Sequence, residues 1–358
     1  MKKLAYFGAA ILALAACNKS QTVTAPEQPG EIAFKAIVAP QTKGEEYPVG
    51  LAFPQDNTYL IYVGASTQVN PNYFALESPW TGKMFSYCTD KWAASTTAGT
   101  ATPIYWPLGG VKVDFLAYAL KAAEMDADGD NTNGAITPVF DNSTSAAKFT
   151  VSDWQVYPAD PDNSVDDQID LMYAVSNGKL NSTSPVTLNF DHTQALVIFN
   201  FRLYHGAGGI TINSITFDSM VKSGSLEVNN QLNKPEVKWT LAAATDDVVM
   251  PKATVSTVST ANTGANAPVA DPAAVVNYGV AIEESVTFAQ LGEPLIVIPQ
   301  EAKNITINYT ISGNTFDYYL NVPRITWEAG RAYIYDLSFN IYEITLDPHV
   351  VDWVDLDV

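Results

Sequence analysis

Cysteine, histidine and basic side chains are scarce in this chain of 358 residues. Two cysteines, Cys17 and Cys88, are too few for a disulfide scaffold. The three histidines, His192, His205 and His349, show no metal-ligand spacing. Lys and Arg number 19 against 38 Asp and Glu, and the net charge of −19 repels phosphate. The composition argues against a disulfide-rich domain, a histidine metal site and nucleic acid as a partner, and we expect no cofactor.

Apolar residues make up 47% of the chain and charged residues 16%, which is enough apolar material for a buried core. Short runs rich in Val, Ile, Tyr, Phe and Thr alternate with clusters of Gly, Pro, Asn and Asp. In the run from Ile305 to Ile311, alternate apolar residues fall on one face, as in a half-buried strand. Helical periodicity is hard to find, so the pattern predicts an all-β fold built from sandwiches.

Residues 1–16 have the pattern of a lipoprotein signal peptide. Lys2 and Lys3 precede a short apolar run, Leu4–Leu14, that cannot span a membrane as a stable helix. The run ends in Leu-Ala-Ala-Cys, the pattern of the bacterial lipobox, with Cys17 as the cysteine. This pattern predicts cleavage before Cys17 and a diacylglycerol on its thiol, which would anchor the chain in a membrane.

Asn18 stands where an Asp would signal retention in the inner membrane, so we expect the outer membrane as the destination. Residues 17–30 are polar and contain prolines and a glycine, as in a tether. The stretch Val175–Pro185 has the composition of a loop and suggests a domain boundary. We therefore expect an N-terminal domain of residues 31–185 and a C-terminal domain of residues 186–358.

Several local patterns, in order along residues 31–358, resemble those of the fimbrillin family, the two-domain pilins of type V pili. They are Ile32-Ala33-Phe34 with Thr42-Lys43, Tyr105–Gly110 with Val113–Tyr118, Asp170–Ala174 with Leu188–His192, Leu295–Gln300 with Trp327–Tyr333, and the terminal Asp352-Trp353. Each motif is short, so the resemblance depends on their order and spacing together.

The resemblance implies two transthyretin-like β-sandwich domains in tandem, no enzymatic activity, and the role of a structural pilin subunit that supports adhesion. In this family a lipidated precursor reaches the outer membrane, and a trypsin-like protease removes its first strand. The C-terminal strand of another subunit then fills the groove that opens, which satisfies the exposed backbone and apolar surface together. The partners implied are other pilin subunits, the processing protease and the outer membrane.

The displaced strand would be Glu31–Val38. Within it the prediction singles out the large apolar residues Ile32, Phe34 and Ile37. Lys43 is the first choice for the cleavage site, because it follows this strand in a polar stretch that suits a protease. Lys35 is the second choice, because it lies inside the strand pattern and is expected to be less accessible.

The donor strand would be the extreme C-terminus, where alternate apolar residues share one face that Asp352 interrupts. These residues are Val350, Val354, Leu356 and Val358. The alternative interpretation is a native edge strand of the C-terminal domain.

Other interpretations remain open from the sequence. Well-known members of the family are cut after Arg, and a Lys at this site leaves room for an uncut anchor subunit; a tip subunit is a further alternative. A surface glycan-binding lipoprotein would share the lipobox and the sandwiches, but would align two or three exposed tryptophans in one cleft. Asp126–Asp130 departs from an EF-hand loop at its glycine and glutamate positions, so an acidic turn is the default and calcium stays open. His192 is interpreted as a core or junction histidine.

Overall fold

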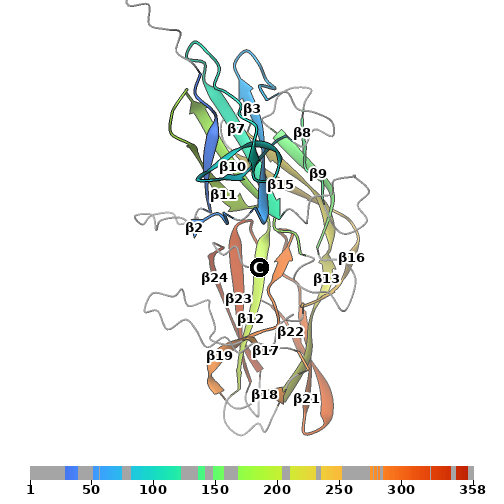
Figure 1. The fold of residues 1–358 in the computed structure, drawn as a ribbon. Coiled ribbons are helices and arrows are strands. Elements are labelled where there is room, and N and C mark those ends of the chain that lie inside the picture. The colour runs from blue at the N-terminus through green and yellow to red at the C-terminus, as the bar shows by residue number, and fades with distance from the viewer. Residues whose placement is uncertain are drawn as a thin grey trace, which may run out of the picture.

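The computed structural model describes residues 29–38, 51–55, 57–74, 82–121, 136–141, 148–156, 168–203, 210–230, 235–251, 275–276, 278–279, 281–282, 285–322, 324–339 and 344–353. All regular elements in these ranges are β-strands, so the all-β class is confirmed. Within them no helix is long and apolar enough to cross a membrane. Figure 1 shows an elongated molecule in which most strands of the first half of the chain lie at one end.

The first sheet has nine strands and closes on itself. Their order is β2 (Leu51–Ala52), β1 (Ala33–Val38), β11 (Val186–His192), β10 (Met172–Lys179), β7 (Val113–Lys121), β3 (Tyr59–Thr67), β4 (Lys83–Cys88), β5 (Lys91–Thr97) and β6 (Thr100–Ala101). β1 also pairs with β5, where Ala33 lies opposite Ala93 and Phe34 opposite Trp92. This pairing joins β1, β11, β10, β7, β3, β4 and β5 into a ring, which we call the closed sheet.

The closed sheet encloses its own hydrophobic core. Phe34, Phe85, Phe115 and Trp92 are all buried there. β7 contains an unbroken apolar run from Phe115 to Leu120. Phe115, Ala117 and Ala119 belong to the enclosed core, whereas Leu116, Tyr118 and Leu120 belong to a second core on the outer side. A strand that is covered on both faces has no polar face.

A four-stranded sheet covers that outer side. Its order is β15 (Glu236–Leu241), β14 (Ser223–Asn229), β9 (Lys148–Gln155) and β8 (Val139–Phe140). The rings of Phe140 and Phe149 lie 5.6 and 5.3 Å from the ring of Tyr118 on β7. The hairpin β14–β15 comes from the second half of the chain, so both halves build this layer.

Two further sheets form the other end of the molecule (Figure 1). The six-stranded sheet runs β17 (Val275–Val276), β19 (Ser285–Leu291), β12 (Ala195–Leu203), β23 (Arg331–Phe339) and β24 (Ile344–Asp352), with β20 (Leu295–Val297) also on β12. The five-stranded sheet runs β16 (Thr245–Val249), β13 (Ile210–Val221), β21 (Ile305–Ile311) and β22 (Asn314–Leu320), with β18 (Ala281–Ile282) also on β13. Between them the ring of Phe199 on β12 lies 5.7 Å from that of Phe217 on β13, and Phe217 meets Trp327 edge-on.

The expected domain boundary between residues 185 and 186 falls where β11 begins. β11 begins at Val186 and pairs with β10 and β1, so it completes the closed sheet instead of starting a second domain. The first part of the loop-like stretch, residues 175–179, belongs to β10, where Gly178 has a φ of 65° at an irregularity in the ladder with β7, and residues 180–185 join β10 to β11. A hairpin turn and a domain linker use the same residue types, so composition cannot separate them.

The expected pair of tandem transthyretin-like sandwiches is not confirmed. The first sheet is a ring, and β14 from the second half pairs with β9 from the first half. The outer core also runs without a break from the four-stranded sheet into the two C-terminal sheets. The outer face of the closed sheet and the C-terminal sheets therefore share this outer core, separate from the enclosed one.

Replacing Phe34 with Ala is expected to lower the free energy of unfolding by about 3–5 kcal/mol, the usual cost of a large aromatic cavity. Lys35→Ala is the matched control, because Lys35 is the exposed neighbour on the same strand, and its effect is expected within about 0.5 kcal/mol. Urea unfolding followed by fluorescence measures both. Equal losses in the two variants would contradict the placement of Phe34 in the closed sheet.

Tyr335→Phe is expected to change the stability of the protein at alkaline pH. Burial raises the pKa of Tyr335 from 10.0 to about 12, while Trp327 Nε1–H donates to its hydroxyl (3.0 Å). Because the folded-state pKa is the higher one, this tyrosine stabilises the fold below pH 10, and the contribution is lost as the pH rises through about 12. Urea unfolding at several alkaline pH values should show a shallower decline for Tyr335→Phe. A decline as steep as that of the unchanged protein would contradict this.

Candidate functional site

β1 is hydrogen-bonded along both of its edges. It runs parallel to β11 over Phe34–Val38 and antiparallel to β5 and β2 on the other side. Just before the strand, Ile32 N–H donates to Ile104 C=O (2.8 Å), and Trp106 N–H donates to Gly30 C=O (3.0 Å). The segment from residue 30 to residue 38 is therefore tied into the closed sheet throughout.

Alternate side chains of this segment enter the enclosed core. Those that do so are Ile32, Phe34, Ala36 and Val38. The ring of Phe34 meets Phe85 at 4.7 Å and Phe115 at 5.1 Å, both edge-on. Ile37, which was expected among the core residues, is half-buried and lies on the opposite face of the strand. The inner face of β1 therefore holds one large ring between smaller aliphatic groups.

The two expected cleavage positions have different surroundings. The Lys35 side chain is exposed, but its backbone lies opposite Thr187 in the β1–β11 ladder. A protease binds its substrate as an extended, unpaired segment, so this backbone is protected while β1 is in place. Lys43 lies outside the described residues, and so does the expected lipidation site, Cys17.

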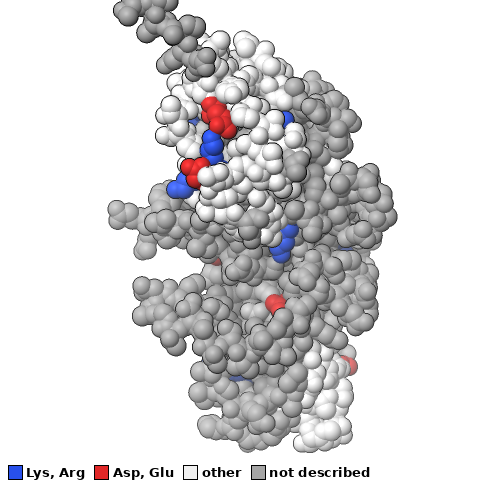
Figure 2. Space-filling model, viewed as in Figure 1, with Lys and Arg blue, Asp and Glu red and all other residues white. Residues whose placement is uncertain are grey.

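Charges of both signs lie on the surface of the closed sheet. Lys91 at the start of β5 and Glu31 just before β1 form an ion pair of 2.6 Å. Figure 2 shows acidic and basic side chains next to one another on the visible, described part of this end of the molecule. A partly exposed pair contributes only about 0–1 kcal/mol. The packing of Phe34 therefore holds the strand far more firmly than this pair does.

The C-terminal strand β24 is held less firmly. It pairs with β23 along its whole length, from Ile344 opposite Phe339 to Asp352 opposite Arg331, and it is an edge of the six-stranded sheet. Val350, expected in the donor strand, is 48% exposed here. The other expected donor residues, Val354, Leu356 and Val358, lie outside the described residues. In this structure β24 is thus an edge strand of its own sheet.

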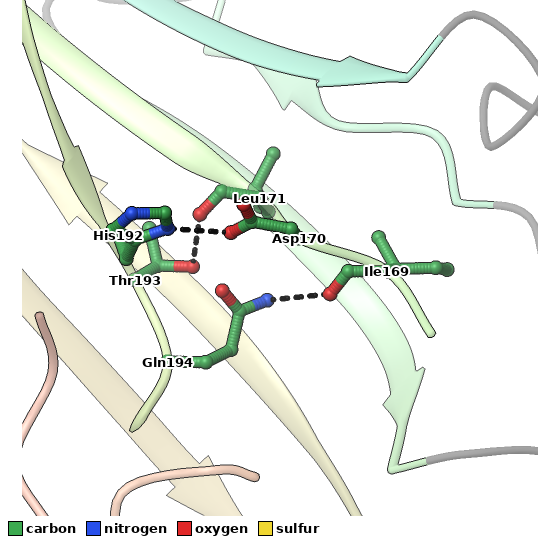
Figure 3. A network of polar contacts seen from close by, with 6 residues as sticks. All are labelled: Ile169, Asp170, Leu171, His192, Thr193 and Gln194. Atoms are coloured by element: carbon green, nitrogen blue, oxygen red, sulfur yellow. Dashed lines mark hydrogen bonds and ion pairs between the residues drawn. The ribbon is translucent and has the colours of Figure 1, made fainter. Parts of the chain in front are cut away.

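The residue after β24, Trp353, is anchored in a buried polar cluster between the two ends of the molecule. Its ring stacks on His192 with a centroid distance of 3.7 Å and an interplanar angle of 6°. Its backbone N–H donates to Gly330 C=O (3.0 Å). His192 ends β11, and its Nδ1 lies 2.7 Å from Asp170 Oδ1 (Figure 3). The C-terminal strand therefore reaches back to the closed sheet.

Neighbouring side chains fix this cluster to the backbone. Thr193 Oγ1–H donates to Leu171 C=O (2.8 Å), and Gln194 Nε2–H donates to Ile169 C=O (3.4 Å) (Figure 3). Trp239 Nε1–H donates to Thr193 C=O (2.7 Å). Burial, together with a smaller effect of the Asp191 carboxylate, raises the pKa of the adjacent Tyr173, which stays protonated at neutral pH.

The cluster is unsuited to chemistry on a substrate. His192 is 1% exposed and Asp170 2% exposed, and the Trp353 ring covers the imidazole face. A substrate cannot reach the imidazole, so we interpret His192 as a packing residue between the two ends of the molecule. Among the described residues no three His, Cys, Asp or Glu side chains are grouped to hold a metal ion. The acidic stretch Asp126–Asp130 lies outside those residues.

Sequence reasoning missed the role of three side chains. Ala36 and Val38 were not singled out, because Ile37 is the larger apolar residue of that stretch. Trp353 was recognised only as part of a terminal motif, and its contact with His192 joins positions far apart in the chain. No local spacing predicts such a contact, although a tryptophan beside a terminal strand is a usual core residue.

The family described as Fimbrillin-like matches residues 61–353. A fimbrial protein from Bacteroides vulgatus is 14% identical with a TM-score of 0.55, and the alignment covers 90% of this chain and 99% of that one. A candidate cell adhesion protein from Bacteroides ovatus is 17% identical with a TM-score of 0.53, covering 92% and 99%. None of the curated proteins matches the chain.

At these identities the solved structures show a shared fold and nothing more. The family match is broader evidence, because it runs from β3 to the residue that stacks on His192. It spans both ends of the molecule and the buried cluster between them. The chain therefore belongs to the fimbrillin-like family.

Proposed function

We propose that this protein is a fimbrial subunit that is exported as a lipoprotein, cut after Lys43 and polymerised by strand exchange. Family membership supports the role of a fimbrial subunit at the cell surface. The observation that carries the finer proposal is the position of β1, which closes a ring of strands and buries alternate side chains in its core. The chain keeps two structural ends in this scheme, a closed sheet that accepts a strand and a C-terminal part that donates one.

Removal of β1 would expose both the backbone and the core of the closed sheet. β11 and β5 would lose a hydrogen-bonded neighbour, and the cavity left by Phe34 would open between Phe85 and Phe115. Both effects are costly, and an incoming strand with alternate apolar residues reverses them together. The groove would require a bulky residue at the Phe34 position and a small one at the Ala36 position.

The C-terminal segment has the position to supply that strand to another copy. β12 starts at Ala195, close after β11, and ends at Leu203. In the ladder with β23, Leu203 lies opposite Phe339, and Phe339 lies opposite Ile344, the first residue of β24. β24 therefore begins at the end of the molecule that is remote from the closed sheet. If β24 detached, residues 344–358 would extend about 50 Å at about 3.3 Å per residue. Such a segment reaches a second subunit placed end to end.

The alternative of a glycan-binding lipoprotein has less support. Trp92, Trp106, Trp154, Trp327 and Trp353 are all 2% exposed or less, and Trp239 is half-buried. The tryptophans of the described ranges therefore form no exposed row for stacking on sugars. An anchor subunit that keeps its lipid and is never cut remains the nearest variant of the proposal.

Lipidation is tested at Cys17. In cells fed labelled palmitate, the protein should carry the label and sediment with the membrane, and Cys17→Ser should abolish both. Cys88→Ser is the matched control, since Cys88 lies at the end of β4, half-buried in the folded protein. A Cys17→Ser variant that still carries the label would rule out the lipobox.

Cleavage and assembly are tested with a trypsin-like protease on a chain that starts at residue 18. We expect one new N-terminus at Gly44 and a ladder of multimers that survives detergent. Lys43→Gln should stay uncut and monomeric, whereas deletion of residues 354–358 should allow cutting but shorten the ladder. Cutting without any multimers would exclude polymerisation by strand exchange, and a new N-terminus at Ala36 would move the site to Lys35.

A further inference from the structure

β24 is held mainly by its backbone pairing with β23, because of its own side chains only Ile344 is buried. Ile344 at its start is 8% exposed and Trp353 just past its end is 2% exposed, whereas Val350 and Val351 between them are 48% and 37% exposed. An ion pair between Arg331 and Asp352 adds one polar contact near the C-terminal end. Trp353 is therefore the largest buried side chain that keeps the C-terminal segment on the molecule.

The surface that receives Trp353 does not belong to the sheet of β24 alone. Its ring lies flat on His192, which ends β11 of the closed sheet, and His192 is held by Asp170 just before β10. From the six-stranded side, Gly330 C=O accepts the backbone N–H of Trp353. Retention of the C-terminal segment thus depends on the position of β11.

The position of β11 depends in turn on β1. Its ladder pairs with β10 in the described ranges involve Phe190, Asp191 and His192 alone, with one further bond from Ser176 Oγ–H to Thr187 C=O (3.2 Å). The pairs of Val186–Asn189 are made with β1. Loss of β1 would leave β11 as an edge strand, held by the few residues that also carry the Trp353 contact.

We infer that Trp353 on His192 is a latch that keeps the C-terminal strand on its own sheet while β1 closes the ring, and frees it once β1 has gone. This inference rests on the proposed function, since it describes how a subunit would withhold its donor strand until it is processed. The two states are a docked and an undocked Trp353, and both β1 and the C-terminal segment bias the same equilibrium.

The polar atoms of the cluster suit a contact that has to open. His192 Nε2, Asp170 Oδ2, Gln194 Oε1 and Trp353 Nε1 are buried without a hydrogen-bond partner among the described residues. A buried group without a partner costs free energy that it regains when water reaches it. Stacking and exclusion of water hold the ring, while these groups oppose closure, so a modest displacement of β11 can release it.

Hydrogen exchange of the backbone amides in residues 344–353, measured by mass spectrometry on the full chain, tests the latch. Trp353→Ala should speed exchange across β24 by about a hundredfold or more, as expected for the loss of a large buried ring. Phe34→Ala should also speed exchange of β24, although Phe34 lies inside the closed sheet. In the double variant that combines Phe34→Ala with Trp353→Ala, the exchange of β24 should be no faster than in Trp353→Ala alone, because the coupling passes through Trp353.

His349→Ala is the matched control, because His349 lies on β24 itself and meets Asp336 at the surface at 3.7 Å. It should leave the exchange of β24 unchanged. Val38→Ala, at the end of the inner face of β1, replaces Phe34→Ala if that variant does not fold. The inference is overturned if weakening β1 speeds exchange in the closed sheet but not in β24, or if the two effects add in the double variant.

This measurement separates the latch from the function on which it rests. Exchange is measured on the uncut monomer and needs no assembly. Coupling between β1 and β24 without multimers after cutting would uphold the latch and refute strand exchange. Multimers without coupling would uphold strand exchange and refute the latch.

Discussion

The pairing of β1 along both edges is the interaction on which the closed sheet depends. β11 and β5 come from distant parts of the chain, and only β1 lies between them. Its inner side chains fill the ring, with Phe34 held between two further phenylalanines. A ring has no free edges, so closure removes the unpaired backbone that an open sheet would present. A single short segment thus supplies both the seam and much of the packing.

The same strand influences the rest of the molecule through β11. That strand carries β1 on its first part and His192 at its end, where the C-terminal Trp353 stacks. The four-stranded sheet strengthens the connection, because it combines β9 from the first half with β14 and β15 from the second. One continuous core follows from this arrangement. The two ends of the molecule are therefore coupled by packing and not by a flexible linker.

Much of the fold could be predicted from local pattern, and the parts that could not are those set by distant contacts. The alternation in Ile305–Ile311 predicts β21 with the same bounds, because a strand with one buried face repeats every two residues. Around Ile37 both faces of the strand carry apolar residues, so alternation alone does not predict which face is buried. Ala36 is too small to signal burial. The segment before Val186 has the composition of a linker. Only the pairing of β11 with β10 shows that this segment joins the two strands of a hairpin. The contact of His192 with Trp353 has no local signature at all.

The two strands near the ends of the described chain are held in opposite ways, and this difference suits their proposed roles. β1 is paired on both edges and buries its inner face, so thermal opening of this strand costs the ladder and the core together. The proposed cut in the following segment would make the loss of β1 irreversible, because the freed strand is no longer tethered next to its groove. β24 has one partner strand and buries only Ile344 among its own side chains, with Trp353 as its main anchor. A strand held in this way can leave by a change in equilibrium, without breaking a covalent bond, which is what the proposed latch requires of it.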